Sequence, residues 1–361
     1  MVICLICEST ATGTLAMVRI IANGMVDKGY VVHLLYSLRA DTPANLEEMF
    51  NGVVLHHIQM NPKNAISGLL SIRKKVKQIN PDIVHLHSSI AGFLGRLSLV
   101  GLSKPSVFYS PHCISFMRKD ISKYKRILFI LLEKISCARE CTYLACSQSE
   151  LAVIKKELRE NVLLIENAIE IKAFQGDYKS EKDSNENIMV INVGGIRKQK
   201  DPSLFSNIAN KFKNENVQFV WIGDGDENLK SELIKSGVSI TGWLQQKQIK
   251  EYYDKADIFL STSQWEGLPV AVIEAMTAGL CIVANSCEGN IDLITDNFNG
   301  ILFNGTVTDG YGKLRRSIED SIVRSRISCQ AQDDSIRRFD KKIFLDKLEN
   351  IYQELDGENE K

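Results

Sequence analysis

The 361-residue chain alternates short apolar, β-branched runs with longer segments of helical periodicity, and this alternation occurs twice. It is typical of βαβ units, in which parallel strands lie buried between helices. In the first half, strands are expected at Val2–Cys7, Tyr30–Tyr36, Val53–Ile58, Asp82–His87, Val107–Ser110, Thr142–Cys146 and Val162–Ile165. In the second half, they are expected at Ile188–Val193, Val217–Ile222, Val238–Thr241, Ile258–Ser261, Cys281–Ala284 and Ile301–Phe303. The pattern predicts an α/β protein with two doubly wound, Rossmann-like domains.

A polar stretch separates the two halves, because residues 175–187 have almost no apolar content. We therefore expect an N-terminal domain over residues 1–172, a linker over 173–187 and a C-terminal domain over 188–340. Residues 341–361 have the periodicity of an amphipathic helix, which is expected to pack back on the first domain. Doubly wound sheets bind ligands at the carboxyl ends of their strands, so a central cleft between the domains is the expected site.

The composition favours a cytoplasmic protein. No segment reaches the roughly 18 apolar residues that span a bilayer, and the apolar start lacks a basic leader. The nine scattered cysteines fit a reducing compartment. The formal net charge is zero, but Lys and Arg outnumber Asp and Glu in residues 1–175 and are outnumbered in the rest. This asymmetry predicts either an anionic partner for the first half or attraction between the two domains.

Two glutamates eight positions apart flank a Gly-Leu-Pro turn that leads from a strand into a helix. Glu266 lies on the turn, and Glu274 lies about a turn and a half into the helix. The helix N-terminus near Gly267, Leu268 and Pro269 can receive a phosphate, with Pro269 in its first turn. A carboxylate inside the helix can accept hydrogen bonds from a ribose diol. This spacing predicts a nucleotide-sugar site, although capping by Glu266 and solvation of Glu274 explain it equally well.

A second constellation follows the first strand of the C-terminal half. Gly194 allows a ligand to approach the backbone, and Arg197 or Lys200 could hold a diphosphate. Asp201 and Pro202 suit the N-cap and first position of the next helix. The alternative is a solvated basic turn.

Two further features are weaker. Asp224-Gly225-Asp226 has the D-x-D form that holds a metal ion in other transferases, but its place between a strand and a helix favours a turn in which Asp226 or Asn228 caps the helix. No metal site is predicted. His112 follows a first-domain strand and could bond a sugar hydroxyl, whereas a structural role is the more common fate of a lone histidine.

Residues 118–134 place five cations just before an apolar run. Such a segment fits an interfacial helix that contacts an anionic membrane. A helix buried in the core fits the apolar run equally well.

These motifs together resemble the family 4 retaining glycosyltransferases, which have the GT-B fold. Glu266 and Glu274 match the paired glutamates of that family, and Gly194 and Lys200 match its first C-domain loop. In the first domain, Gly13 and Thr14 resemble the glycine-rich acceptor-side loop of the family, and His112 falls where such enzymes have a histidine.

One position departs from the family pattern, because Gly195 stands where these enzymes have an arginine. Arg197 is the candidate substitute. The resemblance implies that Lys200, Arg197 and the helix N-terminus offset the charge of the leaving diphosphate. It further implies that Glu274 holds the ribose, and that Glu266 and His112 contact the donor sugar.

The activity implied is retaining transfer of a sugar from a UDP-sugar to a saccharide, with no metal or other cofactor. A lipid-linked acceptor is expected, in bacterial capsule, O-antigen or exopolysaccharide synthesis, at the inner face of the plasma membrane and without nucleic acid as a partner. A UDP-sugar epimerase of the same architecture and a non-catalytic sugar-binding protein are the alternatives.

Overall fold

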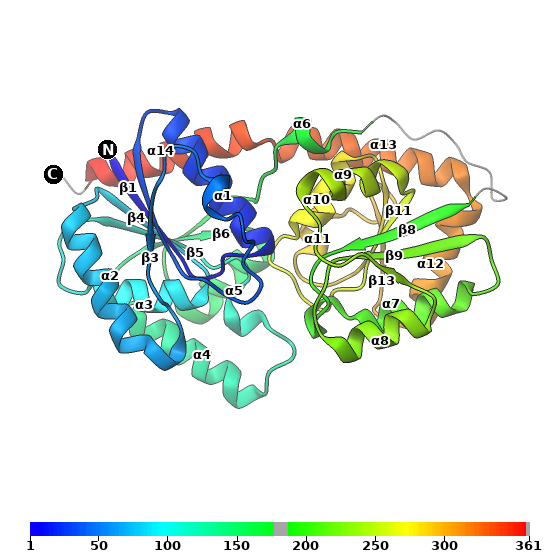
Figure 1. Ribbon diagram of the computed structural model, residues 1–361, viewed down its shortest axis with the longest axis horizontal. Coiled ribbons are helices and arrows are strands. Elements are labelled where there is room, and N and C mark those ends of the chain that lie inside the picture. The colour runs from blue at the N-terminus through cyan, green and yellow to red at the C-terminus, as the bar shows by residue number, and fades with distance from the viewer. Residues whose placement is uncertain (177–186, 359–361) are drawn as a thin grey trace. The chain divides into compact units, whose positions relative to one another are not determined.

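The computed structural model describes residues 1–176 and 187–358. The chain forms two compact units, one from Met1–Ala168 with Lys341–Lys361 and the other from Ile169–Asp340 (Figure 1). The second unit thus begins before the linker predicted at 173–187. Most of that linker lies outside the described residues, and its first residues belong to a short helix, α6 (Ile171–Phe174).

The first unit is built on a seven-stranded parallel sheet in the order β3-β2-β1-β4-β5-β6-β7. The predicted strands are confirmed, with ends that differ by at most one residue. The strands are β1 (Val2–Cys7), β2 (Val31–Tyr36), β3 (Val54–His57), β4 (Ile83–His87), β5 (Ser106–Ser110), β6 (Thr142–Ala145) and β7 (Val162–Leu164). The helices are α1 (Thr12–Asp27), α2 (Ala65–Ile79), α3 (Ser89–Leu99), α4 (Lys123–Ser136), α5 (Gln148–Leu158) and α14 (Lys341–Glu358).

Helices cover both faces of this sheet, and successive side chains of β1 therefore point into two different cores. Ile3 and Leu5 face a core shared with α1 and α14, whereas Cys4 and Ile6 face a core shared with α2, α3 and α5. A strand buried on both faces carries apolar residues at every position, which explains the continuous apolar run.

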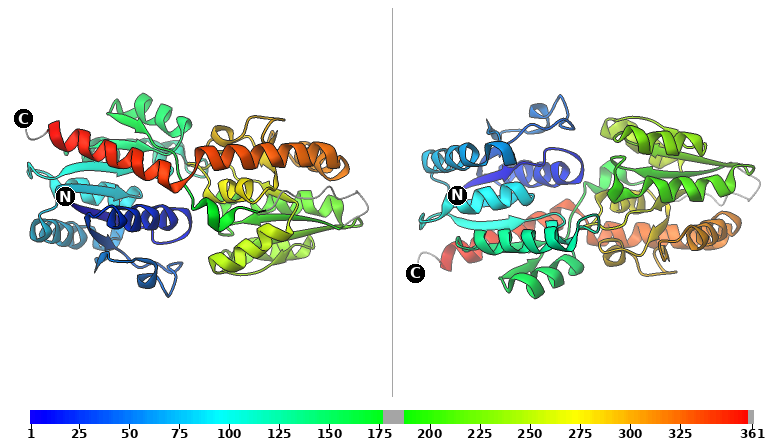
Figure 2. Two further views of the ribbon diagram at one scale, coloured as in Figure 1. Left: turned by 90° about the horizontal axis from the view of Figure 1, so that it is seen from above. Right: turned by 90° about the horizontal axis from the view of Figure 1, so that it is seen from below.

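The C-terminal helix α14 belongs to the first unit and packs beside α1 (Figure 2). Gly24 of α1 lets the two helices approach closely, because a Cβ there would lie 2.3 Å from the Leu345 side chain. Lys28 adds ion pairs of 2.7 Å to Asp346 and Glu349. The returning helix expected for this fold is therefore present.

The second unit has a six-stranded parallel sheet in the order β10-β9-β8-β11-β12-β13. Its predicted strands are confirmed as well. They are β8 (Ile188–Val193), β9 (Val217–Ile222), β10 (Ser239–Ile240), β11 (Ile258–Ser261), β12 (Cys281–Asn285) and β13 (Ile301–Phe303). The helices after α6 are α7 (Pro202–Ala209), α8 (Glu227–Lys235), α9 (Gln246–Lys255), α10 (Val270–Thr277), α11 (Asn290–Leu293), α12 (Val307–Glu319) and α13 (Ser321–Arg338).

This sheet is also covered on both faces. Ile258 and Leu260 of β11 point into a core with α7 and α12, and Phe259 stacks on Tyr253 of α9 with ring centroids 6.5 Å apart. Both sheets follow the doubly wound order in which the chain starts centrally, runs outward on one side and then continues on the other.

Candidate active site

The candidate donor site lies at the carboxyl edge of the second sheet. Strands β8 and β11 are neighbours, and the strand order reverses between them. In doubly wound sheets, the loops at such a reversal form the ligand-binding crevice. The loop after β8 carries Gly194 and Lys200, and the loop after β11 carries Glu266. The fold therefore brings together the two motifs that the sequence analysis treated separately.

Lys200 and Glu266 form a direct ion pair in which Nζ lies 2.7 Å from Oε1. The same carboxylate accepts hydrogen bonds from the Ser263 hydroxyl at 2.8 Å and from the Gln199 side-chain amide at 3.1 Å. The two charged side chains are only 13% and 9% exposed. Glu266 is thus buried and held by three partners, and Ser263 and Gln199 are residues of this network that the sequence analysis missed.

The loops after β8 and β11 are bonded to each other at a second point. The Thr262 hydroxyl donates to the carbonyl of Lys200 at 2.7 Å, and the Gln264 side-chain amide donates to Asp201 at 2.9 Å. Asp201 is also the N-cap of α7, with Pro202 at its first position, as predicted. Lys200 is therefore positioned by a capped helix on one side and by the Thr262 bond on the other.

The turn between β11 and α10 is buried and tightly packed. Gly267 and Leu268 are both buried, and the N–H of Glu266 donates to the carbonyl of Glu288 at 3.0 Å. Gly289 has a φ of +85°, and a side chain there would meet the Cβ of Glu266 at 2.6 Å. A residue other than glycine would therefore displace Glu266.

Helix α10 begins one residue later than predicted. Pro269 is its N-cap rather than part of its first turn, and Val270 is the first helical residue. The Pro269 carbonyl accepts from the N–H groups of Val272 and Ile273 at 3.1 and 3.3 Å. The N–H groups of Val270 and Ala271 precede these donors and have no acceptor within the helix, so this terminus keeps the partial positive charge expected at a phosphate site.

Glu274 lies on α10, half-buried, and accepts a hydrogen bond of 3.0 Å from the Tyr253 hydroxyl. Burial, together with the neighbouring Glu274 carboxylate, raises the pKa of Tyr253 well above its usual value. The tyrosine therefore stays protonated and donates, which fixes one carboxylate oxygen of Glu274. Tyr253 was not predicted, because it belongs to a different helix and carries no motif.

Arg197 lies beside the position that departs from the family pattern. A Cβ built on Gly195 would lie 3.5 Å from Nε and 3.7 Å from Cζ of Arg197. The guanidinium therefore occupies the region that a side chain at position 195 would enter. Gly194 has a φ of +147°, and a Cβ there would lie 3.1 Å from Cε of Lys200. The placement agrees with the hypothesis that Arg197 substitutes for the arginine, and its role stays a prediction.

The D-x-D segment is a turn, as expected. Asp226 caps α8 by accepting from the N–H groups of Asn228 and Leu229. Asp224 accepts from the N–H of Gly225 and pairs with Lys230, both at 2.8 Å. Within the described ranges, no group of three or more His, Cys, Asp or Glu side chains is arranged to hold a metal ion.

In the first unit, the half-buried His112 follows β5 and lies beside two buried histidines, His85 and His87. Its Nε2 lies 3.0 Å from Nδ1 of His87, while His85 bonds Ser110 at 2.8 Å and the Tyr352 hydroxyl at 2.6 Å. Burial lowers the pKa of His112 to about 4 and holds those of His85 and His87 well below their usual value. All three imidazoles are therefore neutral at pH 7.

The predicted acceptor-side loop is not a loop at this position. Gly13 and Thr14 lie in the first turn of α1, which begins at Thr12. They follow the carboxyl end of β1, so they still occupy the edge of the first sheet where ligands bind in such folds. Their acceptor role stays a prediction.

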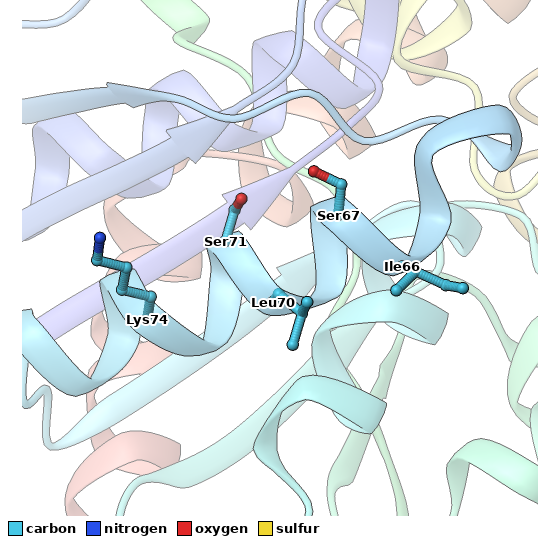
Figure 3. Close-up of a pocket in the computed structure, with 5 residues that line it drawn as sticks. All are labelled: Ile66, Ser67, Leu70, Ser71 and Lys74. Atoms are coloured by element: carbon cyan, nitrogen blue, oxygen red, sulfur yellow. The ribbon is translucent and has the colours of Figure 1, made fainter.

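A surface hollow of about 480 Å³ lies over α2 in the first unit (Figure 3). It is lined by Ile66, Ser67, Leu70, Ser71 and Lys74, all from one helix face. None of the predicted site residues lines it. The polar network around Lys200 and Glu266, rather than this hollow, is the better candidate for chemistry.

Two family models together match most of the chain. Residues 12–173 match Glycosyltransferase Family 4, and residues 175–334 match Glycosyl transferases group 1. The boundary between the matches lies shortly after Ile169, where the second structural unit begins.

Relatives of this chain include bacterial polysaccharide enzymes. An uncharacterized 41.2 kDa protein of the Klebsiella pneumoniae cps region is 30% identical over 258 residues, covering 68% of this chain and 71% of that protein. The Escherichia coli UDP-Gal:α-D-GlcNAc-diphosphoundecaprenol α-1,3-galactosyltransferase is 27% identical over 314 residues, covering 80% of this chain and 79% of that enzyme.

Solved structures show the same fold at lower identity. Sucrose-phosphate synthase from Thermosynechococcus elongatus matches with a TM-score of 0.84 and 15% identity, over 98% of both chains. Anabaena HepE in complex with UDP-glucose matches with a TM-score of 0.81 and 18% identity, over 98% of this chain and 100% of that one. With the two family models and the paired-glutamate site, these likenesses establish that the chain is a GT-B glycosyltransferase belonging to family 4.

Proposed function

We propose that the protein transfers a sugar, with retention at the anomeric carbon, from a UDP-sugar to a saccharide carried on a lipid diphosphate. The named substrates of the Escherichia coli relative, a UDP-sugar and a diphosphoundecaprenol-linked sugar, support this pair of substrates. A Campylobacter jejuni relative, 25% identical over 313 residues, is likewise named for a diphospho-undecaprenol acceptor. The product would enter bacterial surface-polysaccharide synthesis.

The observation that carries the proposal is the Lys200–Glu266 pair at the carboxyl edge of β8 and β11. When the bond between the anomeric carbon and the diphosphate breaks, the leaving oxygen takes the electron pair and gains charge. A lysine ammonium has three N–H donors, and the pair with Glu266 uses one of them. The others can be donated to phosphate oxygens. Fixed donors of this kind usually supply the largest part of catalysis.

Arg197 and the N-terminus of α10 would add positive charge to the same leaving group. Glu274, oriented by Tyr253, would accept from the ribose hydroxyls, and Glu266 would contact the transferred sugar. In this mechanism the protein cations do the work that a divalent metal does in other transferases. Asp224 and Asp226 are already committed to the turn that they form.

A screen of UDP-sugars for UDP release, with and without an undecaprenyl-diphosphate-linked acceptor, tests the proposal. We expect one donor to react, with an unchanged rate in EDTA and a product whose anomeric coupling constant matches that of the donor. Loss of transfer in EDTA would return Asp224 and Asp226 to consideration as metal ligands. Formation of an isomerised nucleotide sugar without an acceptor would indicate an epimerase instead.

The surface of α4 supports a membrane-linked acceptor. Five apolar side chains on this helix are each at least half exposed, and their spacing places them within an arc of about 100°. They are Tyr124, Ile127, Leu128, Leu131 and Ile135. Exposed lysines flank the stripe: Lys123, Lys125 and Lys134.

The opposite face of α4 is polar and points inward. Glu133 is 3% exposed and forms an ion pair with the fully buried Arg96 of α3, which also bonds Tyr143. Ser136 is buried on the same side. The helix is therefore held by these buried polar contacts and by Ile130 and Phe129, which pack into the core, while its apolar stripe faces outward. Part of the apolar run is buried, because Ile130 belongs to the core with α2, α3 and α5, whereas the stripe itself stays exposed.

We further propose that this α4 surface rests on an anionic bilayer at the cytoplasmic face, where a lipid-linked acceptor would be presented. Among the described residues, no helix is both long and apolar enough to cross a membrane. An apolar stripe flanked by lysines is typical of helices that lie in the interface, and each lysine near an anionic surface contributes about 1 kcal/mol.

Co-sedimentation with phosphatidylglycerol and phosphatidylcholine vesicles tests the contact. Complete burial of a leucine yields about 1.5–3 kcal/mol, so a half-exposed one has about 1 kcal/mol left to gain. Replacing Leu128 and Leu131 with asparagine should therefore weaken binding about 30-fold, since 1.4 kcal/mol is a factor of ten. Ile322→Asn, at an apolar position on α13 that is even more exposed, is the control. Equal losses in both variants, or indifference to anionic lipid, would contradict the proposal.

A further inference from the structure

The turn that carries His112 holds two consecutive residues in a conformation that L-amino acids rarely adopt. His112 has a φ of +55°, and Cys113 has a φ of +89°. Such a conformation is unfavourable for a residue with a side chain, and it persists only when the surrounding structure fixes it. The turn follows β5 directly, at the carboxyl edge of the first sheet.

A buried carboxylate on another element supplies the contacts that fix this turn. Glu150 is 0% exposed and lies in the first turn of α5. Its Oε1 accepts from the N–H groups of Cys113 and Ile114, both at 2.8 Å, and its Oε2 accepts from the N–H of Cys146 at 2.9 Å. One carboxylate therefore ties the strained turn after β5 to the segment that joins β6 to α5.

Glu150 occupies a position from which a glutamate usually bonds to its own helix, but here it bonds to a turn that is distant along the chain. Ser147 is the N-cap of α5 and accepts from the N–H of Glu150 at 3.1 Å, so the two residues have the spacing of a capping box. In a capping box the glutamate reaches back to the N–H of the N-cap residue itself. Here Oε1 instead crosses to the His112 turn, 36 and 37 residues away along the chain.

This turn sets the direction of the His112 ring. Nε2 of His112 lies 3.0 Å from Nδ1 of His87, and the two rings are nearly parallel, with centroids 5.3 Å apart. A change of backbone angle at His112 would move the ring away from this partner. Geometry at the catalytic ring thus depends on the backbone that Glu150 holds.

We infer that Glu150 is the positioning residue of the His112 turn: its three backbone hydrogen bonds keep the imidazole in the orientation used for sugar transfer. The inference rests on the proposed function, because the role of His112 in transfer comes from the family resemblance.

The decisive variant is Glu150→Gln, which keeps the side-chain shape but replaces one acceptor oxygen with an N–H donor. Whichever way the glutamine amide is oriented, its NH₂ group would face a backbone N–H where the carboxylate offers an acceptor oxygen, so at least one hydrogen bond is lost. We expect turnover to fall about 10-fold to 100-fold, as for small misplacements of reacting groups, with the donor KM unchanged. His112→Ala should cause a loss at least as large, and adding Glu150→Gln to it should cause no further loss, because both act through one ring.

Asp257→Asn is the matched control. Asp257 is 6% exposed and accepts the backbone N–H of Met189 at 2.9 Å, but it precedes β11 at the amino end of the second sheet, away from the site residues. This variant replaces a buried, backbone-bonded carboxylate with a neutral amide without touching the His112 turn, so it should keep wild-type turnover. Losses of equal size in both variants would assign the Glu150 effect to general stability and overturn the inference.

A second readout does not depend on activity. The chain has six histidines, so a ¹⁵N imidazole spectrum is simple enough to assign by single substitutions. Glu150→Gln should shift the signals of His87 and His112 and leave those of β2 and β3 in place. Unshifted signals overturn the positioning role, whatever the rate. Normal turnover of His112→Ala would instead refute the part of the proposed function that concerns His112, while the spectrum still decides the role of Glu150.

Discussion

Replacing Lys200 with alanine is expected to change stability as well as catalysis, because Lys200 is the cation paired with Glu266. The variant would leave a carboxylate that is 9% exposed beside two neutral donors, Ser263 and Gln199. Removing one partner of a buried ion pair costs about 3–5 kcal/mol. Since Lys200 is itself 13% exposed and Glu266 keeps its two neutral hydrogen bonds, we expect the lower end, about 3 kcal/mol.

A second variant separates the two effects. In Lys200→Met with Glu266→Gln, neutral side chains of similar volume replace both charges, so no buried charge is left unpaired. Replacement of a whole buried pair is often neutral, and the free energy of unfolding should return to within about 1 kcal/mol of wild type. Transfer should not return, because the leaving diphosphate still lacks its cation. Loss of one such fixed donor typically lowers turnover by about 10²–10³.

Urea unfolding followed by tryptophan fluorescence suits this test, because Trp221, Trp243 and Trp265 all belong to the second unit. The difference in unfolding midpoint, at constant slope, gives the change in stability. Turnover is measured as UDP release. An unchanged midpoint for Lys200→Ala would refute the buried pair, and recovered turnover in the double variant would refute the role of Lys200 in catalysis.

Three further outcomes are expected. Glu274→Ala should weaken UDP binding about 10-fold to 100-fold in isothermal titration, since a hydrogen bond to a charged group contributes about 1.5–3 kcal/mol. Unchanged affinity would exclude a role for Glu274 in binding the ribose. Below pH 6.5 the unfolded chain protonates His85, His87 and His112, while the folded chain keeps them neutral because their folded pKa values are lowered. The free energy of unfolding should therefore fall by about 1.4 kcal/mol per pH unit for each of these histidines. The fall for each histidine ends at its folded pKa, which is about 4 for His112. Urea titrations across this range should show that slope, and a flat profile would contradict it. Gly223→Ala should abolish UDP binding. At a φ of +144°, the new alanine Cβ would lie 2.2 Å from a carbonyl oxygen of the loop after β8 and would displace that loop. Normal UDP binding would show that the loop is not part of the site.

The sequence predicted the strands well because both sheets are buried on both faces. A strand of this kind is a short, continuous apolar run, and polar or glycine-containing turns bound it clearly. Local capping was predictable for a similar reason. Asp201 before Pro202, and Asp226 before α8, satisfy helix N–H groups within three residues of themselves, so the chemistry needs no distant partner.

The pairing inside the site could not be predicted in the same way. Lys200 and Glu266 each belong to a motif, but nothing in the sequence indicates that the two side chains touch, since their contact depends on β8 and β11 being neighbours. Tyr253 contacts Glu274 from another helix and lacks any motif. The start of α10 was misplaced by one residue because Pro269 suits both the N-cap and the first helical position, and only its carbonyl bonds distinguish the two.

Which side of α4 is buried could not be predicted from the sequence alone. Periodicity reveals that a helix has an apolar side, but it does not say whether that side meets the core or the solvent. The deciding contact is the ion pair between Glu133 and Arg96, 37 residues apart along the chain. A buried carboxylate is tolerated only beside a partner, so Glu133 must face Arg96, and the apolar stripe on the opposite side must face outward. The buried charge within an apolar run is therefore the feature that determines which side of this helix faces outward.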